Sequence, residues 1–440
     1  MSQLLYGTGR TTITPPLGLE LCGYGPYLER RSTKIHHDLQ CTALALSDGE
    51  QTYVWVSNDL IWTDRSLVEA THRLVRDAYG LDPAHVVITN THTHSGPATM
   101  KTVAWGAWDE DYTNTLPGKF AEAIGQAVSN MEPGRIGFGQ VAIPELSVNR
   151  VDEGGIVDQD ALLMRIDDDE GYLQVVTINF SAHPVTLGAS TLVCGDYPAD
   201  GIGKMERELD GVRMLFFQGS CGNLNCRGFG DGLDAMDANG TLLKDSVIPA
   251  LDEIKTTPDV TLDGDMVEMP LPTKVPEREP LEAELVDYAQ QVAKFEGDIT
   301  SRDYRQLRFE QDWRKLQLEL IDTPRPQRLE VKVAYLRINE AVLLSHPMEL
   351  FLEYGNGVKE ASPYPHTMVI GYANEPVGYL ARPQDFSQEG FGWYAAVFAP
   401  RICRHLEFEP EAGEVFRDHL IALLHWIKER EGACNLPSSD

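Results

Sequence analysis

The sequence predicts an α/β fold in which strands pair in both directions. Residues 52–57 (TYVWVS) and 86–91 (VVITNT) are rich in β-branched residues, and residues 66–79 between them have helical, amphipathic spacing. This strand–helix–strand order is typical of an α/β layer. From residue 135 to 217 strand-like runs outnumber helical ones, which favours mixed pairing in the middle of the chain.

The remaining elements follow from hydrophobic periodicity and from turn residues. Further strands are expected at residues 135–143, 161–166, 174–181, 213–217, 330–338, 341–345 and 367–372. Further helices are expected at residues 119–131, 200–209, from about 349 onward, and 415–428. Charged, proline-punctuated sequence between residues 258 and 326 contains two helical stretches, at about 282–295 and 303–320, and predicts a helical excursion from the core.

Length, composition and charge exclude several classes of protein. A chain of 440 residues suggests two or three domains or one large α/β unit. Contents of 42% hydrophobic and 24% charged residues are typical of soluble globular proteins. A formal charge of −30 repels phosphate backbones and anionic lipids, so we expect no nucleic-acid partner. No run approaches the ~20 apolar residues of a membrane span, so no stable membrane insertion is expected.

The cysteines and the N-terminus predict a cytoplasmic protein. Seven cysteines are thinly spread and form no CxxC pair, which argues against both a disulfide framework and a thiolate zinc site. The N-terminal residues show no basic segment followed by an apolar one, as a secretion signal would. Nothing in the sequence specifies an oligomeric state.

Residues 86–97, VVITNTHTHSGP, are the first candidate for a functional site. A β-type run ends there in two histidines and a Ser-Gly-Pro turn. Side chains two apart on a strand share a face, so His92 and His94 are expected to point the same way, with attachment points ~6.5–7 Å apart. Both imidazoles would then reach one metal ion, or one would bind it while the other moves protons. The alternative is a polar strand end without a metal.

Three other segments place ligand-type residues where a strand meets a loop. His183 follows a strand and precedes Pro184, Glu349 lies in the expected first turn of a helix, and Tyr379 follows a Pro-Val-Gly turn. Glu349 and Tyr379 each have an ordinary alternative. A glutamate at a helix start often compensates the helix dipole, and Tyr379 has the alternative of a half-buried structural tyrosine.

Taken together, these motifs resemble in order and spacing the catalytic domain of the neutral ceramidases, zinc amidases that hydrolyse N-acylsphingosines. The likeness covers nearly the whole chain, and THTHSGP is its most specific motif. The other matching segments are GYG at 23–25, HHDL at 36–39, Asn149-Arg150, NFSAHP at 179–184, GDYP at 195–198, FFQGSCGNLN at 216–225, HPMEL at 346–350 and NEPVGYL at 374–380.

The resemblance implies two mixed β-sheets flanked by α-helices, in a single zinc-hydrolase domain over residues 1–440 with the helical excursion at about 258–326. It also implies that zinc is held by two histidines, a glutamate and a tyrosine. The matching positions are His92, His183, Glu349 and Tyr379. By the same matching, His94 and Arg150 line the reacting group.

The sequence departs from the family pattern in three places. Asn225 stands where the ceramidases carry a serine that is central to the reaction. A second active-site tyrosine falls at Phe391, with Tyr394 close enough to replace it. The chain also stops after the helix near residue 428, so no C-terminal immunoglobulin-like domain is expected.

These features predict a zinc-dependent hydrolase that cleaves an amide or related acyl bond of a small, soluble N-acyl substrate. Two imidazoles, a carboxylate and a phenolate suit Zn2+ and leave room for a water, whose pKa zinc brings to about 7. His94 would transfer the proton, Arg150 would stabilise the oxyanion, and Asn225 would donate a hydrogen bond. Ser220 and Cys221 remain as other candidate nucleophiles, without a base visible beside either.

Three alternatives stay open. The first is that the chain is a true ceramidase acting on lipid-like N-acylsphingosine, although no basic amphipathic helix suggests how it would draw a lipid from a membrane. The second is that it is a TIM-barrel amidohydrolase, a class that also carries HxH after a strand, although that fold places HxH after the first barrel strand and needs a bridging lysine. The third is that it is an inactive, ligand-binding relative, which the missing serine favours and the four candidate ligands oppose.

Overall fold

Two mixed β-sheets form the centre of the protein. The computed structural model describes residues 2–434. The larger sheet has the order β11-β9-β8-β6-β1-β3-β4-β5, with β13 paired to the start of β1. Its strands are β1 Ser2–Thr12, β3 Gln40–Ser47, β4 Thr52–Asn58, β5 Val86–Asn90, β6 Glu132–Ala142, β8 Asp160–Asp168, β9 Leu173–Phe180, β11 Arg213–Gln218 and β13 Asp259–Val260. Only β4–β5 and β9–β11 pair in parallel within it.

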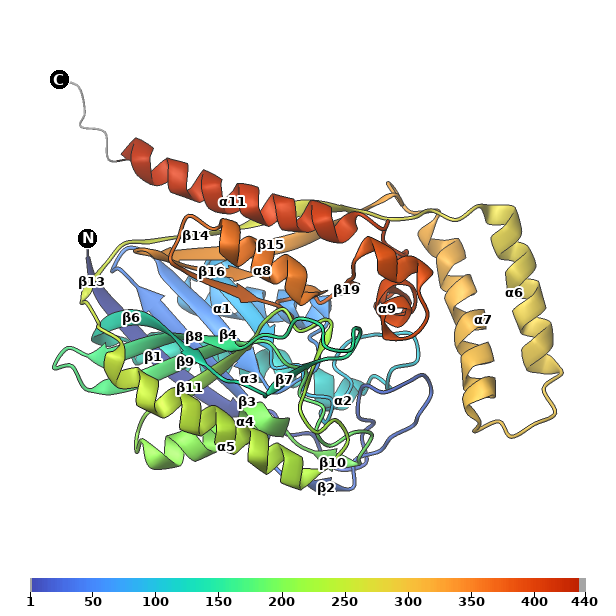
Figure 1. The fold of residues 1–440 in the computed structure, drawn as a ribbon, viewed down its shortest axis with the longest axis horizontal. Helices are drawn as coiled ribbons and strands as arrows, with labels where there is room; N and C mark the ends of the chain where they lie inside the picture. The colour runs from blue at the N-terminus through green and yellow to red at the C-terminus, as the bar shows by residue number, and fades with distance from the viewer. Residues whose placement is uncertain (1, 435–440) are drawn as a thin grey trace.

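The second sheet has the order β14-β15-β16-β18 and packs against the first (Figure 1). Its strands are β14 Leu262–Pro272, β15 Arg328–Ile338, β16 Ala341–Ser345 and β18 His366–Ile370. One buried cluster joins the two sheets, and the indole Nε1 of Trp55 in β4 donates to Ser345 Oγ in β16 at 2.9 Å. Three short pairs complete the sheet structure: β2 Lys34–Ile35 with β10 Leu192–Val193, β7 Ser147–Asn149 with β12 Leu224–Cys226, and β17 Met348–Leu350 with β19 Gly378–Leu380.

Helices cover the outer faces of both sheets. On the larger sheet lie α1 Arg65–Tyr79, α3 Leu116–Ser129, α4 Asp196–Glu208 and α5 Leu233–Ala250, and on the second sheet lie α8 Leu352–Ala361 and α11 Ala412–Cys434 (Figure 1). Gly7 and Gly9 in β1 allow α3 to pack closely, because a Cβ there would lie 2.2 and 2.0 Å from helix carbonyl oxygens. The short helices are α2 Glu110–Thr113, α9 Phe391–Trp393, α10 Ala399–Ile402, the 3-10 turns Pro83–His85, Leu251–Glu253 and Pro383–Ser387, and the π-helical turn Tyr394–Phe398.

A helical hairpin, α6 Arg278–Ala293 and α7 Arg302–Leu320, stands out from the body of the protein (Figure 1). The inner helix α7 docks through Phe309 and Trp313, which are fully buried, while α6 buries only Leu281 among its residues. Within the stretch where an excursion was expected, residues 262–272 form β14 and belong to the second sheet.

The predicted α/β class with mixed sheets is confirmed. The TIM-barrel alternative is wrong, because most neighbouring strands are antiparallel and the strands form two open sheets rather than a closed parallel barrel. Strands β1 and β3 were missing from the prediction. Glycines at positions 7 and 9 weaken the strand pattern of β1. No helix among residues 2–434 is long and apolar enough to cross a membrane.

Candidate metal and active site

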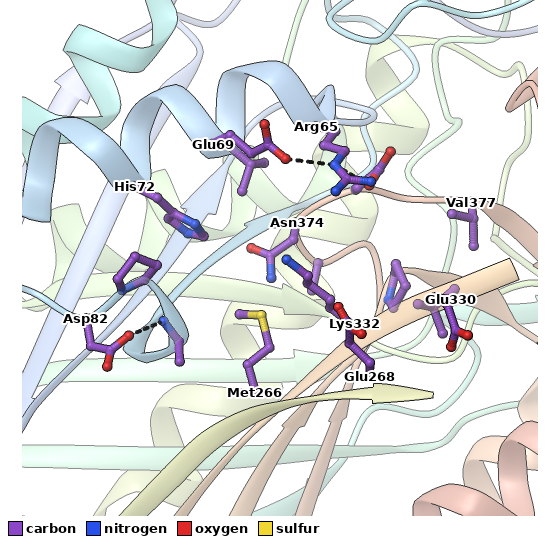
Figure 2. A pocket seen from close by; sticks show the side chains of 17 residues that line it. Arg65, Glu69, His72, Asp82, Met266, Glu268, Glu330, Lys332, Asn374 and Val377 are labelled. Atoms are coloured by element: carbon purple, nitrogen blue, oxygen red, sulfur yellow. Dashed lines mark hydrogen bonds and ion pairs between the residues drawn. The ribbon is translucent and has the colours of Figure 1, made fainter. Parts of the chain in front are cut away.

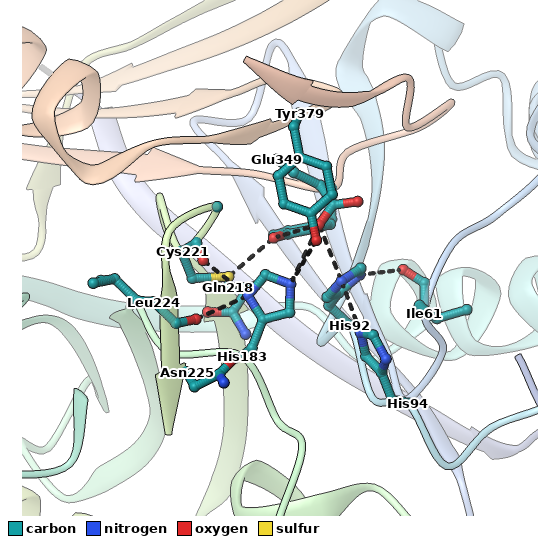
Figure 3. A network of polar contacts seen from close by, with 12 residues as sticks. Ile61, His92, His94, His183, Gln218, Cys221, Leu224, Asn225, Glu349 and Tyr379 are labelled. Atoms are coloured by element: carbon teal, nitrogen blue, oxygen red, sulfur yellow. Dashed lines mark hydrogen bonds and ion pairs between the residues drawn. The ribbon is translucent and has the colours of Figure 1, made fainter. Parts of the chain in front are cut away.

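The four residues predicted to bind zinc come together from four separate segments (Figure 3). His92 follows β5, His183 follows β9, and Glu349 and Tyr379 lie in β17 and β19. The loops after β5 and β9 are held to each other by Gln218 at the end of β11, whose Nε2 donates to Thr91 O at 3.1 Å and to Ala182 O at 3.0 Å. The ends of strands distant in sequence therefore meet at one point.

The donor atoms of these residues converge. Oε2 of Glu349 lies 3.3 Å from Nε2 of His92 and 3.3 Å from Nε2 of His183. The hydroxyl of Tyr379 lies 3.4 Å from Nε2 of His183. Both imidazoles and the carboxylate are at most 1% exposed. Buried groups of this kind require partners or a metal ion.

Backbone carbonyls fix the orientation of both histidine ligands. Nδ1 of His92 lies 3.0 Å from Ile61 O, and Nδ1 of His183 lies 2.8 Å from Cys221 O. Since a carbonyl oxygen only accepts, each Nδ1 carries the proton and each Nε2 presents a lone pair toward the centre. Two correctly oriented imidazole nitrogens, a carboxylate and a phenol make a donor set that fits zinc.

The loop geometry differs from the predicted extension of the strand. Strand β5 ends at Asn90, and His92 has a left-handed backbone with φ 67°. His92 and His94 therefore do not share a strand face, and the prediction that they point together because of strand periodicity is wrong. They converge because the chain turns sharply, with His92 N bonded to Leu60 O at 2.9 Å. Left-handed non-glycine residues are uncommon and cluster at functional sites.

Glu349 also lies in a different element from the one predicted. The first turn of a helix was expected there, but residues 348–350 form β17, and α8 begins only at Leu352. Glu349 is directly opposite Tyr379 in the parallel pair β17–β19, so their side chains project from the same side.

His94 lies beside this set and is a further metal ligand candidate. Its Nε2 is 3.2 Å from Nε2 of His92, and the ligand nitrogens of His92, His94 and His183 all lie within 4.8 Å of one another. Nδ1 of His94 is buried without a hydrogen-bond partner among the described residues, next to Gly23. His94, unlike His92 and His183, lines the larger cavity outside the centre.

Arg150 and Asn225 are brought together at the same place. Nη2 of Arg150 donates to Tyr379 Oη at 2.9 Å and lies 3.0 Å from Nε2 of His183, while Nη1 donates to Asn225 Oδ1 at 3.1 Å. The guanidinium carbon is 3.9 Å from the centre of the Phe391 ring. Burial and Arg150 lower the pKa of His183 to about 3, so its imidazole is neutral at pH 7.

A cavity of about 890 Å³ leads to these residues. Arg150, His94 and Tyr379 form its polar floor, and its walls are largely aromatic. A much smaller cavity of about 20 Å³, bounded in part by His92, Glu349 and Tyr394, lies behind it and has room for about one water. Another cavity, of about 580 Å³, lies between α1 and the strands β14 and β15 (Figure 2). It contains none of the candidate ligands and is lined by charged residues such as the ion pair Arg65–Glu69.

Comparisons with known proteins identify the fold. Residues 4–214 match the family model for neutral/alkaline non-lysosomal ceramidase, N-terminal. The neutral ceramidase from Pseudomonas aeruginosa matches with a TM-score of 0.76 and 17% identity, over 98% of this chain and 75% of that one. The chain has the neutral ceramidase fold. A structure described as ceramidase complexed with C2 matches with a TM-score of 0.75 and 18% identity, over 100% and 77% of the two chains. No curated protein matches the sequence.

The family resemblance drawn from the sequence motifs is therefore confirmed, and the departures from the ceramidase pattern can be placed. Asn225, which the motif matching places where the ceramidases carry a serine, accepts a hydrogen bond from Nη1 of Arg150. Phe391 stacks on Arg150, whereas Tyr394 lines both the large and the small cavity, 6.1 Å from Tyr379 between ring centres. Of the two positions considered for the second tyrosine of the ceramidase pattern, Tyr394 is thus the one that borders both cavities.

Sequence reasoning missed Tyr372, which supports the centre from behind. Its ring lies 4.1 Å from the ring of His92, and its hydroxyl lies 2.9 Å from Sγ of Cys221 and 3.5 Å from Oε2 of Glu349. A signal for Tyr372 was present in the sequence, because it is the last residue of the expected strand 367–372 and lies in the segment GYANEP. Its position at a strand end resembles that of the predicted ligands.

Proposed function

We propose that this protein is a zinc-dependent hydrolase that cleaves the amide or a related acyl bond of a small N-acyl substrate. The observation that carries the proposal is the convergence of His92, His183, Glu349 and Tyr379 on one point, with both Nδ1 atoms bonded to carbonyls. Zinc, when bound, would act as a Lewis acid and lower the pKa of a coordinated water to about 7, which supplies the nucleophile.

Arg150 has the position of an oxyanion stabiliser. Its guanidinium lines the floor of the cavity beside Tyr379, and it is oriented from the other side by Asn225 and by Gly222 O. A well-placed donor of this kind contributes about 3–4 kcal/mol to transition-state stabilisation. Asn225, in this arrangement, acts on the substrate through Arg150 and replaces the ceramidase serine as a positioning residue.

His94 is positioned to move the proton. It faces the cavity that receives the substrate, and Nε2 lies near the centre. Burial and the neighbouring His92 lower the pKa of His94 well below its usual value, so the neutral imidazole is the form that accepts a proton at pH 7. Tyr394, whose pKa is raised by burial, keeps its proton and serves as a hydrogen-bond donor.

Neither Ser220 nor Cys221 has the surroundings of a nucleophile. Burial raises the pKa of the Cys221 thiol, and its Sγ is engaged with the hydroxyl of Tyr372 at 2.9 Å. Ser220 is buried and packs against Gly355 of α8, where a Cβ would lie 2.2 Å from its Oγ. Both facts favour hydrolysis without a covalent acyl-enzyme.

Ceramidase activity on N-acylsphingosine is the second candidate. The similar structures are those of ceramidases, and the aromatic walls of the cavity suit a lipid-like chain.

We also propose a cytoplasmic location. This agrees with the cysteines for which the structure describes a pairing state, because all of them are free thiols.

The test is elemental analysis combined with an assay of N-acyl substrates of increasing size. We expect about one zinc per chain in the native protein and less than a tenth of that in His92→Ala and in His183→Ala. His425→Ala, which removes an exposed histidine of α11, is the matched control and should keep its zinc. Full zinc in both ligand variants would reject the site. Hydrolysis of N-acylsphingosine, but of no small N-acyl compound, would favour the second candidate.

A further inference from the structure

The hairpin α6–α7 forms one wall of the substrate cavity. The first turns of α7 contribute Arg302, Asp303, Arg305 and Gln306 to the lining, on the same cavity that Arg150 and His94 line. The hairpin therefore contributes side chains to the place where a substrate must lie, although none of the ceramidase motifs lies within it.

This wall is firmly attached. The ring of Phe309 lies 4.5 Å from that of Phe398 and 5.9 Å from that of Trp105, and both partners line the cavity. Glu310 of α7 forms a buried ion pair with Arg401 at 3.1 Å. Because Phe309 and Glu310 directly follow the cavity-lining turns, the arginines at positions 302 and 305 are presented from a fixed helix.

Arg302 and Arg305 differ from the other basic residues of α7. Arg314 and Lys315 form ion pairs with carboxylates, and Arg308 stacks on the ring of Tyr27 at 4.0 Å. Arg302 and Arg305 have no carboxylate within 4 Å among residues 2–434. Nε of Arg305 is shielded from solvent and has no hydrogen-bond partner in the same part of the chain.

Of the two guanidinium groups, that of Arg305 is the more informative, because its Nε is shielded from solvent without a partner, whereas Arg302 is exposed. The chain has 67 acidic and 37 basic residues, yet neither guanidinium has a carboxylate within 4 Å among the described residues. A guanidinium carries five donors in a fixed fork that matches a carboxylate or phosphate. At a substrate cavity, the group that satisfies Arg302 and Arg305 is most simply supplied by the substrate.

The other walls of the cavity are apolar. They include Trp105, Phe229, Phe391, Trp393 and Phe398.

We propose that the substrate is an anionic amphiphilic amide, with its carboxylate or equivalent acidic group bound by Arg302 and Arg305 and its apolar chain against the aromatic walls. The inference rests on the proposed hydrolase function, and it names the substrate class as N-acyl compounds that carry an acid.

Binding of ketones that resist hydrolysis tests the proposal separately from activity. The probes are 11- to 15-carbon oxo-acids with two, four or six methylenes between ketone and carboxylate, each paired with its carboxamide, which has nearly the same shape without the charge. Calorimetry on the zinc-loaded protein should show at least one acid binding about tenfold or more tightly than its amide. Equal binding within every pair would overturn the proposal.

Variants assign the effect to the two arginines. Arg305→Gln and Arg302→Gln should each weaken binding of the preferred acid about tenfold and leave binding of its amide unchanged. Arg305→Lys, which keeps the charge, should recover part of the loss. Lys315→Gln removes one charge from the same helix, away from the cavity, and is the matched control. If Lys315→Gln and Arg305→Gln weaken binding of the preferred acid equally, the effect comes from net charge alone, and the anion site is rejected.

Hydrolysis assays then test the hydrolase function and the anion site separately. N-acyl compounds with the same spacing of carboxylate and amide are compared with their neutral carboxamides. Selective binding of the oxo-acids without turnover of any amide would reject the hydrolase function and leave the anion site standing. Turnover of acid and carboxamide with the same kcat/KM, in the native protein and in Arg305→Gln, would reject the anion site and leave the hydrolase function standing.

Discussion

The candidate metal centre and the hairpin wall border the same cavity but are built in opposite ways. At the centre the side chains are buried, and backbone carbonyls orient the two histidines, Ile61 O for His92 and Cys221 O for His183. At the hairpin, the cavity-lining arginines project from the start of the docked helix α7, and neither has a carboxylate within 4 Å among the described residues. The first arrangement keeps reacting groups in place, and the second leaves groups available to a ligand. Chemistry and selectivity are therefore expected to respond to different substitutions.

The largest expected effect separates proton transfer from metal binding at the centre. His94→Ala should keep zinc, because His92, His183, Glu349 and Tyr379 supply four donors, but it should lower kcat about 10²–10⁴-fold through loss of proton transfer. Zinc content and single-turnover rates measure the two effects. His425→Ala serves again as the control. An empty site in His94→Ala would make His94 a ligand and move the proton-transfer role to another residue.

An intermediate effect is expected from loosening the hairpin. Trp313 is fully buried beneath it, and Trp313→Ala leaves a cavity that costs about 3–5 kcal/mol of local stability. We expect KM to rise about tenfold or more, with kcat changed less than threefold, because the wall shifts while the metal donors stay. Trp426→Ala, which removes a half-exposed tryptophan from α11, is the control. A fall in kcat with unchanged KM would contradict the idea that the centre controls the chemistry and the hairpin controls substrate binding.

The smallest effect is expected at the two other candidate nucleophiles. Ser220→Ala and Cys221→Ala should each keep kcat within about threefold of the native value, since neither group is activated. Steady-state assays and mass spectrometry of the protein quenched during turnover check this expectation. An acyl adduct on Ser220 or Cys221 would overturn the mechanism.

The sequence predicted which residues would meet, but not how the backbone brings them together. The order of the motifs was enough to select His92, His183, Glu349 and Tyr379. The left-handed turn at His92 was not predictable, because it depends on a bond to Leu60 O in the neighbouring loop. The strand at Glu349 was missed for a similar reason, since it exists only through pairing with residues 378–380.

The specificity wall was the least accessible to sequence reasoning. Helical spacing correctly predicted α6 and α7 and the packing of Trp313, because those depend on local periodicity. The direction in which the hairpin docks depends on contacts with distant residues such as Phe398 and Arg401. The sequence analysis consequently did not single out Arg302 and Arg305, which border the cavity only because of how the hairpin docks.

The origin of the metal donors in separate segments links metal binding to folding of the whole chain. Residues 4–214, which match the ceramidase family model, contain His92 and His183, whereas Glu349 and Tyr379 come from the C-terminal part. Neither part alone carries the full proposed donor set, so zinc at this site would bind the complete fold in preference to any partly folded state. At a free zinc concentration a thousandfold above its dissociation constant, this linkage adds about 4 kcal/mol to the free energy of unfolding. Chelation would therefore weaken the association of the two parts as well as stop the chemistry.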